Sequence, residues 1–395
     1  DVYKRQVVTP EGKYVLNLIP SGILHPEAVC VLGGGMVVDL DHLRHEMSML
    51  QYMKVKIDSD NLRISDKATI CMPFHVRQDV LEEERLLEKG AAFGSTRRGI
   101  AYAYGDKYMK KTLRMGDLLN LNSIAIKRRL QVILESKNLI MENVYGQNPL
   151  SFDELYNWCE SQAEYFRNYI CDTGKLLNNA AEAGKNILFE AQLGALRDID
   201  YGIYPYTSSS NTIAAYAPIG AGIPQRTPDR VVGVMKAYST CVGEGPFAAE
   251  DAMPEEWNNK LRNAGGEFGA ATGRPRRVGP FDAVASRYGI ECQGADDIAL
   301  TKLDVLSEFD TIPVVTAYEL DGHTIDTFPA DSSLERVKPV VEEYPGWHCD
   351  ISGCKSWEEL PKEAREYVLA IEKLVNHRIY LVSTGAERSE YITIS

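Results

Sequence analysis

Apolar residues along the chain follow two patterns, and the two patterns alternate. Short, nearly continuous apolar runs bounded by glycine, proline or polar residues are typical of strands. Longer segments in which apolar residues recur every three or four positions are typical of helices that pack one face against a core. The strand-like runs cover residues 14–18, 28–32, 36–38, 186–190, 230–236, 298–300 and 379–382. Strands alternating with helices predict an α/β fold, with a mostly parallel central sheet flanked by helices.

The helical pattern is clearest in two regions. An apolar stripe over residues 40–53 predicts a helix whose hydrophobic face packs on the core. From about residue 78 to 183 the chain is predicted to be mostly helical, which forms a helical subdomain. Serine followed three residues later by glutamate is a capping box, and it predicts helix starts at Ser151 and again at Ser356.

Composition narrows the class of protein. The 395 residues suffice for one large α/β domain, so we expect a single domain over residues 1–395. No apolar run reaches about eighteen residues and no signal peptide opens the chain, which predicts a cytoplasmic protein without membrane contact. The net charge of -13 argues against a nucleic-acid partner. The eight cysteines are scattered without a CxxC pair, which favours reduced thiols over disulfides or zinc.

A glycine-rich stretch over residues 265–277 concentrates positive charge in this acidic chain. It lacks helical or strand periodicity and is predicted to be a loop. Arg274, Arg276 and Arg277 lie within four residues of one another. Guanidinium groups grip small carboxylates and phosphates in bidentate fashion, so this loop suits capture of such an anion. The alternative is a solvated basic patch.

A second glycine-bounded cluster, residues 94–99, reads Gly-Ser-Thr-Arg-Arg-Gly. Backbone amides, the hydroxyls of Ser95 and Thr96, and arginine together suit a phosphate group. The alternative is an ordinary surface loop. The three glycines at residues 33–35 are predicted to form a tight turn, because no Lys-Ser/Thr follows them as a phosphate loop requires.

Polar segments follow three of the predicted strands, where ligands bind in open parallel sheets. Residues 198–211 follow the run at 186–190, and Ser383-Thr384-Gly385 follows the run at 379–382. The run at 298–300 ends in Thr301-Lys302-Leu303-Asp304. An aspartate in this position can accept hydrogen bonds from both N1–H and the 2-amino group of guanine, a donor pair that adenine lacks. Asp304 is therefore a candidate guanine-binding residue, although a Thr-Lys-x-Asp pattern by itself is weak to moderate evidence.

Taken together, these stretches resemble adenylosuccinate synthetase. The matching segments keep the order of that family, and they are residues 18–26, 198–211, 236–247, 265–277, 300–306 and 383–385. The resemblance implies a P-loop NTPase-like fold and a magnesium-dependent homodimeric ligase that joins IMP to L-aspartate with GTP as co-substrate. In that family an aspartate base takes the N1 proton of IMP, the 6-oxygen attacks the γ-phosphate, and the amino group of L-aspartate displaces the 6-phosphoryl group.

The resemblance also implies roles for residues at matching positions. The IMP-binding residues are expected to be Ser95, Thr96, Lys110, Gln192, Ser208 and Arg274. The aspartate-binding residues are expected to be Val242, Thr272, Arg274 and Arg276. The GTP-binding residues are expected to be Arg276, Lys302, Asp304, Ser383 and Gly385.

The sequence departs from the family pattern in three places within the matched region. Leu193 occupies the place of a glutamine that contacts IMP, unless Gln192 substitutes for it by a local shift. Arg97, Ala101 and Tyr102 replace two glycines and a proline beside the phosphate cluster. Lys110 stands where the family lends an arginine across the dimer interface, which keeps the charge but loses the planar fork.

The glycine-rich Gly-Asp-Glu-Gly-Lys-Gly-Lys loop and the Asn-Asn-Ala-Gly-His-Thr segment of the family have no counterpart in this sequence. Val7 aligns beyond that histidine, so roughly the first 45 residues of a full-length relative are expected to be missing, and residues 1–6 resemble a foreign junction. The catalytic aspartate and histidine and the magnesium ligands are expected in that missing segment. The chain as written is therefore expected not to catalyse the ligation.

Two further functions stay open at this point. One is that of a phage-type relative that joins aspartate to dGMP instead of IMP, because the glutamine and phosphate regions are altered. The other is a non-catalytic purine-nucleotide-binding protein that keeps the guanine and IMP pockets.

Overall fold

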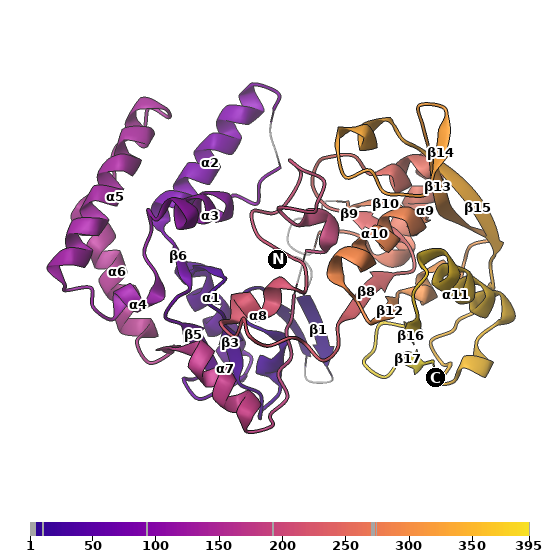
Figure 1. Cartoon of the computed structure of the whole chain (residues 1–395), viewed down its shortest axis with the longest axis horizontal. Coiled ribbons are helices and arrows are strands. Elements are labelled where there is room, and N and C mark those ends of the chain that lie inside the picture. Colours follow the sequence, from indigo (N-terminus) through magenta and orange to yellow (C-terminus); the bar gives the residue numbers. More distant parts are fainter. Residues whose placement is uncertain are drawn as a thin grey trace.

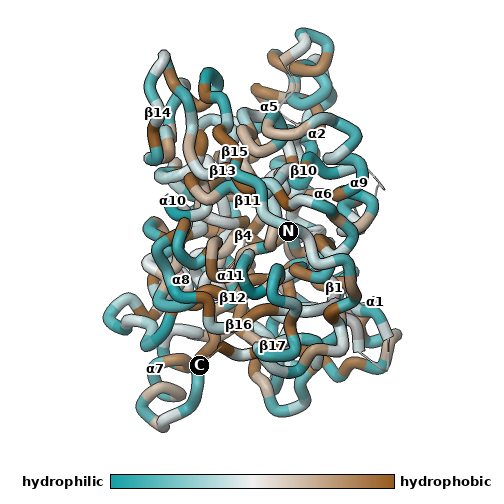
Figure 2. Tube along the Cα trace, turned by 90° about the vertical axis from the view of Figure 1, so that its right-hand side faces the viewer, coloured by the Kyte–Doolittle hydropathy of each residue, from teal (hydrophilic) through white to brown (hydrophobic). Residues whose placement is uncertain are grey.

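The hydrophobic residues gather in two main cores in the computed structural model, which describes residues 5–9, 12–91, 94–191, 193–269, 273 and 275–394. Buried residues from Tyr14 to Ile170 form the first core, and buried residues from Ala237 to Ile392 form the second. In Figure 1 the two groups of elements lie side by side, with α8 (Tyr216–Ala221) between them. In Figure 2 hydrophilic residues follow the outer loops, whereas hydrophobic residues recur along the central strands. The expectation of a single domain stays a prediction.

The first group contains three small sheets. Its strands are β1 (Arg5–Thr9), β2 (Gly12–Leu16), β3 (Cys30–Leu32), β4 (Val37–Asp39), β5 (Leu62–Ser65), β6 (Thr69–Cys71) and β7 (Ile170–Cys171). Strands β3, β5 and β7 pair in parallel, and so do β4 and β6, whereas β1 and β2 form an antiparallel hairpin. Parallel neighbours far apart in the sequence require crossover connections, which the helices supply.

Helices dominate the rest of the first group. They are α1 (Leu40–Tyr52), α2 (Pro73–Glu88), α3 (Ile100–Met109), α4 (Met115–Leu118), α5 (Ile124–Asn143), α6 (Phe152–Phe166) and α7 (Thr173–Glu182). The predicted helical region at 78–183 and the stripe at 40–53 are confirmed. The hydroxyl of Ser151 accepts the Glu154 amide at the start of α6, as the capping box predicts.

The second group is built on two larger sheets and three helices. Its strands are β8 (Val232–Lys236), β9 (Ser239–Cys241), β10 (Arg277–Gly279), β11 (Phe281–Asp282), β12 (Asp297–Thr301), β13 (Thr311–Leu320), β14 (His323–Ile325), β15 (Lys338–Pro345), β16 (Ile379–Ser383) and β17 (Tyr391–Thr393). Its helices are α9 (Glu255–Gly265), α10 (Ala283–Gln293) and α11 (Lys362–Val375). One sheet has the order β17-β16-β12-β8, in which β8, β12 and β16 are parallel. In the other, β13 pairs in parallel with β11 and antiparallel with β14 and β15.

The α/β class with parallel sheets flanked by helices is confirmed, although the parallel strands are divided among several sheets. Two local predictions are wrong. Residues 186–190 form no strand, and the Leu188 side chain is 90% exposed. An apolar run becomes a strand only where a neighbouring strand can satisfy its backbone groups, and no described strand pairs with this run.

The capping box at Ser356 is also wrong. Helix α11 begins at Lys362 after Pro361, and Ser356 makes no side-chain cap hydrogen bond. Proline disfavours helical dihedrals in the residue that precedes it, and Leu360, which precedes Pro361, is accordingly extended. Glu359 instead accepts a hydrogen bond from the Lys355 amide. Leu360 and Ala364 are buried as the stripe predicted.

Candidate active site

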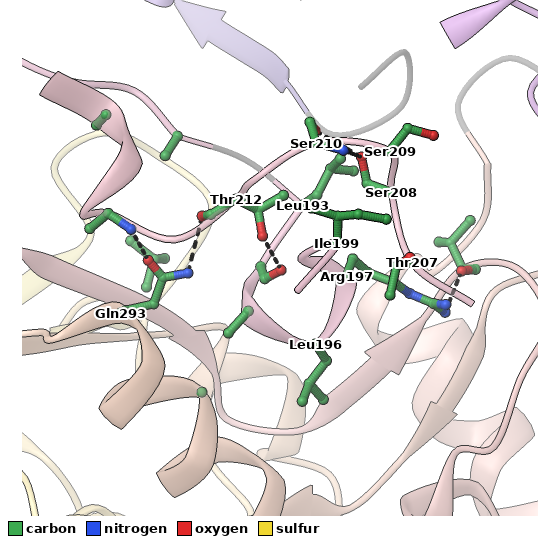
Figure 3. A pocket seen from close by; sticks show the side chains of 18 of the residues that line it. Leu193, Leu196, Arg197, Ile199, Thr207, Ser208, Ser209, Ser210, Thr212 and Gln293 are labelled. Carbon is green, nitrogen blue, oxygen red and sulfur yellow. Dashed lines mark hydrogen bonds between the residues drawn. The ribbon is translucent and has the colours of Figure 1, made fainter. Parts of the chain in front are cut away.

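A large cavity lies between the two groups of elements. Its volume is about 2240 Å³, and its lining includes Ser95, Thr96, Ser208 and Val242 from the predicted site, together with Lys236. Figure 3 shows one wall of it, where residues 193–212 pass close to the strands of the second group. The structure therefore brings residues from the predicted IMP and aspartate sites to one space.

The loop at residues 94–99 has most of its donors engaged by two buried carboxylates of α2. Glu83 accepts the amides of Gly94 and Ser95 at 2.8 and 3.2 Å. Asp79 accepts the Ser95 hydroxyl at 2.6 Å and the Gly99 amide at 2.8 Å. In this conformation carboxylates of the protein already accept hydrogen bonds from three of the loop's amides, so the expectation that these amides bind a phosphate stays a prediction.

Glycine is required at the end of this loop. Gly99 has φ of +73°, and a Cβ there would lie 2.6 Å from the backbone of His75. The end of the loop therefore packs directly against the backbone of α2.

A buried charged network that the sequence did not reveal joins three helices behind this loop. His75 of α2 contacts Asp106 of α3 at 2.8 Å, and Lys137 of α5 contacts the same carboxylate at 2.6 Å. Burial lowers the pKa of His75 below its usual range. Because the Met72 amide donates to Nδ1, the neutral ring donates from Nε2 to Asp106. The three residues lie on separate helices, so no sequence spacing signals the network.

The segment after residue 193 contains Ser208, which was predicted to bind IMP. The hydroxyls of Ser208 and Ser210 lie 2.9 Å apart. The Ser208 amide donates to the Arg197 carbonyl at 2.8 Å. Gln192 lies outside the described residues. Leu193 has φ of +81°, is 37% exposed and lines the cavity.

Four of the residues predicted to bind GTP come together at the ends of β12 and β16: Lys302, Asp304, Ser383 and Gly385. Leu300 of β12 lies opposite Val382 of β16, so the segments that follow, with Lys302 and Ser383, leave the same edge of the sheet. The Ser383 hydroxyl donates to the Gly385 carbonyl at 2.8 Å. These residues do not line the large cavity but lie beyond its wall.

Asp304 is the most distinctive residue of this edge. Its side chain is half-buried, and burial raises its pKa above the usual range. Among the described residues, only its own backbone amide donates to the carboxylate. A desolvated carboxylate with unused acceptor capacity is suited to a ligand that brings its own N–H donors.

The loop at residues 265–277, here called the arginine loop, contains a carboxylate, Glu267, to which the sequence assigned no role. Glu267 is fully buried and contacts Lys236 at 2.8 Å, the Tyr238 hydroxyl at 2.7 Å and Arg276 at 2.7 Å. Lys302 lies 3.8 Å from the same carboxylate. Burial alone would raise the pKa of Glu267, but Lys236, with the bonds from Tyr238 and Arg276, lowers it to about 2.

Thr272 and Arg274, the other predicted loop residues, lie outside the described residues. Arg277 forms an ion pair with Glu250 at 2.6 Å and donates to the Gly245 carbonyl at 2.7 Å. Its guanidinium therefore makes structural contacts with two other segments of the chain. Val242 is 49% exposed.

Lys110 lies apart from the other predicted residues. It ends α3 with φ of +62° and is exposed. Together with Lys111, Arg128 and Arg129 it lines a second cavity of about 820 Å³. The structure of a single chain therefore does not bring Lys110 to the wall that Ser95 and Ser208 share.

Within the residues that the structure describes, no group of three or more histidine, cysteine, aspartate or glutamate side chains could hold a metal ion. None of the described helices is long and apolar enough to cross a membrane. All eight cysteines are free thiols.

Parallel strands that end in a guanine-suited carboxylate, beside a cation-rich loop and a large cavity, define a nucleotide-binding α/β protein. A family model described as adenylosuccinate synthetase matches residues 4–392. The chain therefore belongs to the adenylosuccinate synthetase family, a family of ligases. The GTP-dependent reaction of this family joins IMP to L-aspartate.

Individual relatives agree with this assignment. Adenylosuccinate synthetase of Pelobacter propionicus is 43% identical over 389 residues, which cover 98% of this chain and 89% of that protein. The Geobacter sulfurreducens enzyme of the same name is 43% identical over 390 residues, with the same two coverages. A solved structure of fully ligated adenylosuccinate synthetase from Plasmodium falciparum has a TM-score of 0.89 and 31% identity, and it covers 100% of this chain and 91% of that one.

The phage-type alternative finds weaker support. The succinoaminodeoxyadenylate synthetase of cyanophage S-2L, solved with dGMP and dATP, is 17% identical with a TM-score of 0.56. It covers 99% of this chain and 84% of its own. That likeness concerns the fold alone, so the resemblance to the IMP-dependent family is the one confirmed.

Proposed function

We propose that this protein serves the GTP-dependent ligation of IMP and L-aspartate to adenylosuccinate, GDP and phosphate, a step of AMP biosynthesis. The observation that carries the proposal is the half-buried Asp304 carboxylate, which stands at a parallel-strand end beside Lys302, Ser383 and Gly385. Guanine brings N1–H and 2-amino donors that match its unused acceptors, and adenine brings neither. The Lys302 stem would pack along the base.

The cation-rich side of the site is assigned to L-aspartate. One buried carboxylate, Glu267, faces Lys236, Arg276 and Lys302, so positive charge exceeds negative charge there. A substrate dicarboxylate or a nucleotide phosphate would balance the excess. In this proposal Arg276 binds mainly L-aspartate, together with Val242, Thr272 and Arg274, and contributes only a minor contact to GTP.

IMP is assigned to the large cavity, where Ser95, Thr96 and Ser208 form part of the wall, with Gln192 and Arg274 as further contacts. Since Asp79 and Glu83 occupy the loop donors, phosphate binding requires either a rearrangement of residues 94–99 or contact through Thr96 and arginine. These residues bind and orient the substrates; none of them is assigned as the base that takes the N1 proton.

Magnesium belongs to the proposal only through the family. No cluster of carboxylates or histidines within the described ranges fits the ion, so none of these residues is named as a ligand and no step is assigned to it.

A homodimer completes the proposal. Lys110 lies away from the serine wall, and a second copy of the chain could present its Lys110 to the IMP phosphate. Ile124 and Val132, exposed beside this basic cavity at 85% and 59%, offer apolar surface for such contact. We also propose a cytoplasmic location, which the eight free thiols support.

Competition binding to the purified chain tests the proposal. GTP should bind at least about tenfold more tightly than ATP, because each charge-assisted hydrogen bond to Asp304 contributes about 1.5–3 kcal/mol. IMP should compete better than dGMP for the large cavity; the reverse order would support the phage-type alternative. Equal affinity for GTP and ATP would contradict the guanine assignment.

An activity assay tests catalysis: the purified chain is incubated with GTP, IMP and L-aspartate, and adenylosuccinate is measured. Formation of adenylosuccinate would exclude the non-catalytic nucleotide-binding alternative. It would also overturn the sequence-based expectation of no turnover.

A further inference from the structure

Arg197 ties together two segments of the cavity wall that are far apart in the sequence. It ends the short 3-10 turn Ala195–Arg197, and its guanidinium reaches across to the second group of elements (Figure 3). There it donates to the Val242 carbonyl at 2.8 Å, to the Glu244 carbonyl at 3.4 Å and to the Cys241 sulfur at 2.8 Å.

The same residue also holds the serine segment. Its guanidinium donates to the Tyr206 carbonyl, and its own carbonyl accepts the Ser208 amide at 2.8 Å. One side chain and its backbone thus bond both the wall segment with Ser208 and the wall segment with Val242.

These contacts assign Arg197 to positioning rather than to direct substrate binding. Both terminal nitrogens of the guanidinium already donate to protein acceptors. Within the described part of the chain, Arg197 forms no ion pair with a carboxylate. A planar guanidinium suits this task because its donors have a fixed geometry, which a lysine ammonium does not reproduce.

The segment that Arg197 contacts contains two glycines in the left-handed region. Gly243 and Gly245 both have positive φ, at +88° and +106°. A Cβ on Gly245 would lie 2.6 Å from the Tyr206 ring, so the glycine lets the two segments pack closely. Arg277 donates to the Gly245 carbonyl at 2.7 Å. Two arginines outside the turn, Arg197 and Arg277, therefore hydrogen-bond to its backbone.

We propose that Arg197 is a positioning residue that couples the aspartate side of the site to the IMP side. It fixes the segment of Val242 against the segment of Ser208, so that ordering of one segment by its ligand also orders the other. This inference rests on the proposed function for the identity of the two ligands. The positioning role itself rests only on the hydrogen bonds of Arg197 with the two wall segments.

The test is calorimetric titration of L-aspartate into the purified chain, with and without saturating IMP. The wild type should bind L-aspartate more tightly with IMP by at least about fivefold, the lower end of typical coupling between sites. Arg197→Met keeps the apolar stem but removes all donors, and it should reduce this factor to below about twofold. Arg197→Lys should give an intermediate factor. Arg167→Met, on an exposed arginine, is the matched control and should leave the factor unchanged.

Hydrogen exchange of the unliganded protein provides a reading that needs no substrate. In Arg197→Met the amides of residues 242–245 should exchange at least about tenfold faster than in the wild type, while those of α5 keep their rates. Failure of the wild type to bind IMP or L-aspartate would contradict the proposed function, and the exchange rates would still decide whether Arg197 holds the segment of Val242. An unchanged coupling factor or unchanged exchange at residues 242–245 in Arg197→Met would overturn the inference.

Discussion

The two ends of the candidate active site use buried carboxylates in opposite ways. At the arginine-loop end, Glu267 lies beneath the cations of Lys236, Arg276 and Lys302. At the other end, formed by the loop at residues 94–99, Asp79 and Glu83 accept hydrogen bonds from neutral amides and a hydroxyl. The first arrangement leaves positive charge for anionic ligands, whereas the second consumes the donors that a phosphate would use. Residue types alone do not distinguish a site that is ready for a ligand from one that is internally satisfied.

The strongest test of this contrast removes the carboxylate beneath the arginine loop. Glu267→Ala leaves the partly buried Lys236 and Arg276 without their counter-charge, which should destabilise the protein by about 3–5 kcal/mol. Urea unfolding measures the change, with Glu256→Ala on the exposed face of α9 as the control. A loss below about 1 kcal/mol would show that the cations do not depend on Glu267.

The pH dependence of stability gives a second reading of the same carboxylate. The folded-state pKa of Glu267 is lowered to about 2 from its ordinary value of 4.5, so its stabilisation is fully present above pH 4.5. It should be lost as the pH falls from 4.5 through about 2. The difference in unfolding free energy between the wild type and Glu267→Gln isolates this contribution. A difference that stays constant over that window would contradict the lowered pKa.

Arg276→Leu should act mainly on one substrate. Loss of a charged partner from a bound carboxylate should weaken L-aspartate binding about 30- to 1000-fold, while GTP affinity changes about threefold or less. Titration of each ligand checks this, with the exposed Arg336→Leu as the control. Equal losses for both ligands would instead show that Arg276 acts by holding Glu267.

The smallest effect on stability and ligand binding is expected at the loop of residues 94–99. Asp79→Asn keeps one acceptor and loses the other, so the protein should lose about 0.5–1.5 kcal/mol of stability. IMP affinity should change about threefold or less, since the affected donors are already engaged within the protein. Thermal unfolding and IMP titration give the two values, and Glu88→Gln at the exposed end of α2 is the control. A gain in IMP affinity above about tenfold would show that Asp79 competes with the phosphate.

That the residues proposed for guanine lie at one edge of a sheet could be predicted from the sequence, because this placement follows from strand pairing; their role stays a prediction. Once the runs at 298–300 and 379–382 are strands of one parallel sheet, Asp304 and Ser383 must leave the same edge. The contacts of Glu267 could not be predicted in this way. Lys236 lies 31 residues from Glu267 in the sequence, and only the fold brings them together.

Other features could not be predicted for a similar reason. The apolar run at 186–190 has the pattern of a strand, but pairing depends on neighbours that the local pattern does not reveal. The loop at residues 94–99 has residue types that suit a phosphate, but the sequence did not show that carboxylates of α2, eleven to twenty residues upstream, accept from its donors. Arg197 precedes the polar segment that the sequence indicated, which begins at residue 198. Its four acceptors are backbone carbonyls and a sulfur atom, which no residue pattern reveals.

Guanine recognition by Asp304 is the central feature of the proposed function, and one substitution tests it directly. In Asp304→Asn the amide would donate to the 2-oxo group of xanthine, so the affinity ratio of GTP to XTP should fall at least about tenfold from the wild-type value. Competition binding of both nucleotides to the two proteins, with L-aspartate and IMP affinities as internal controls, measures the ratio. A ratio that is unchanged in Asp304→Asn, while both proteins bind nucleotide, would contradict the assignment of the guanine site.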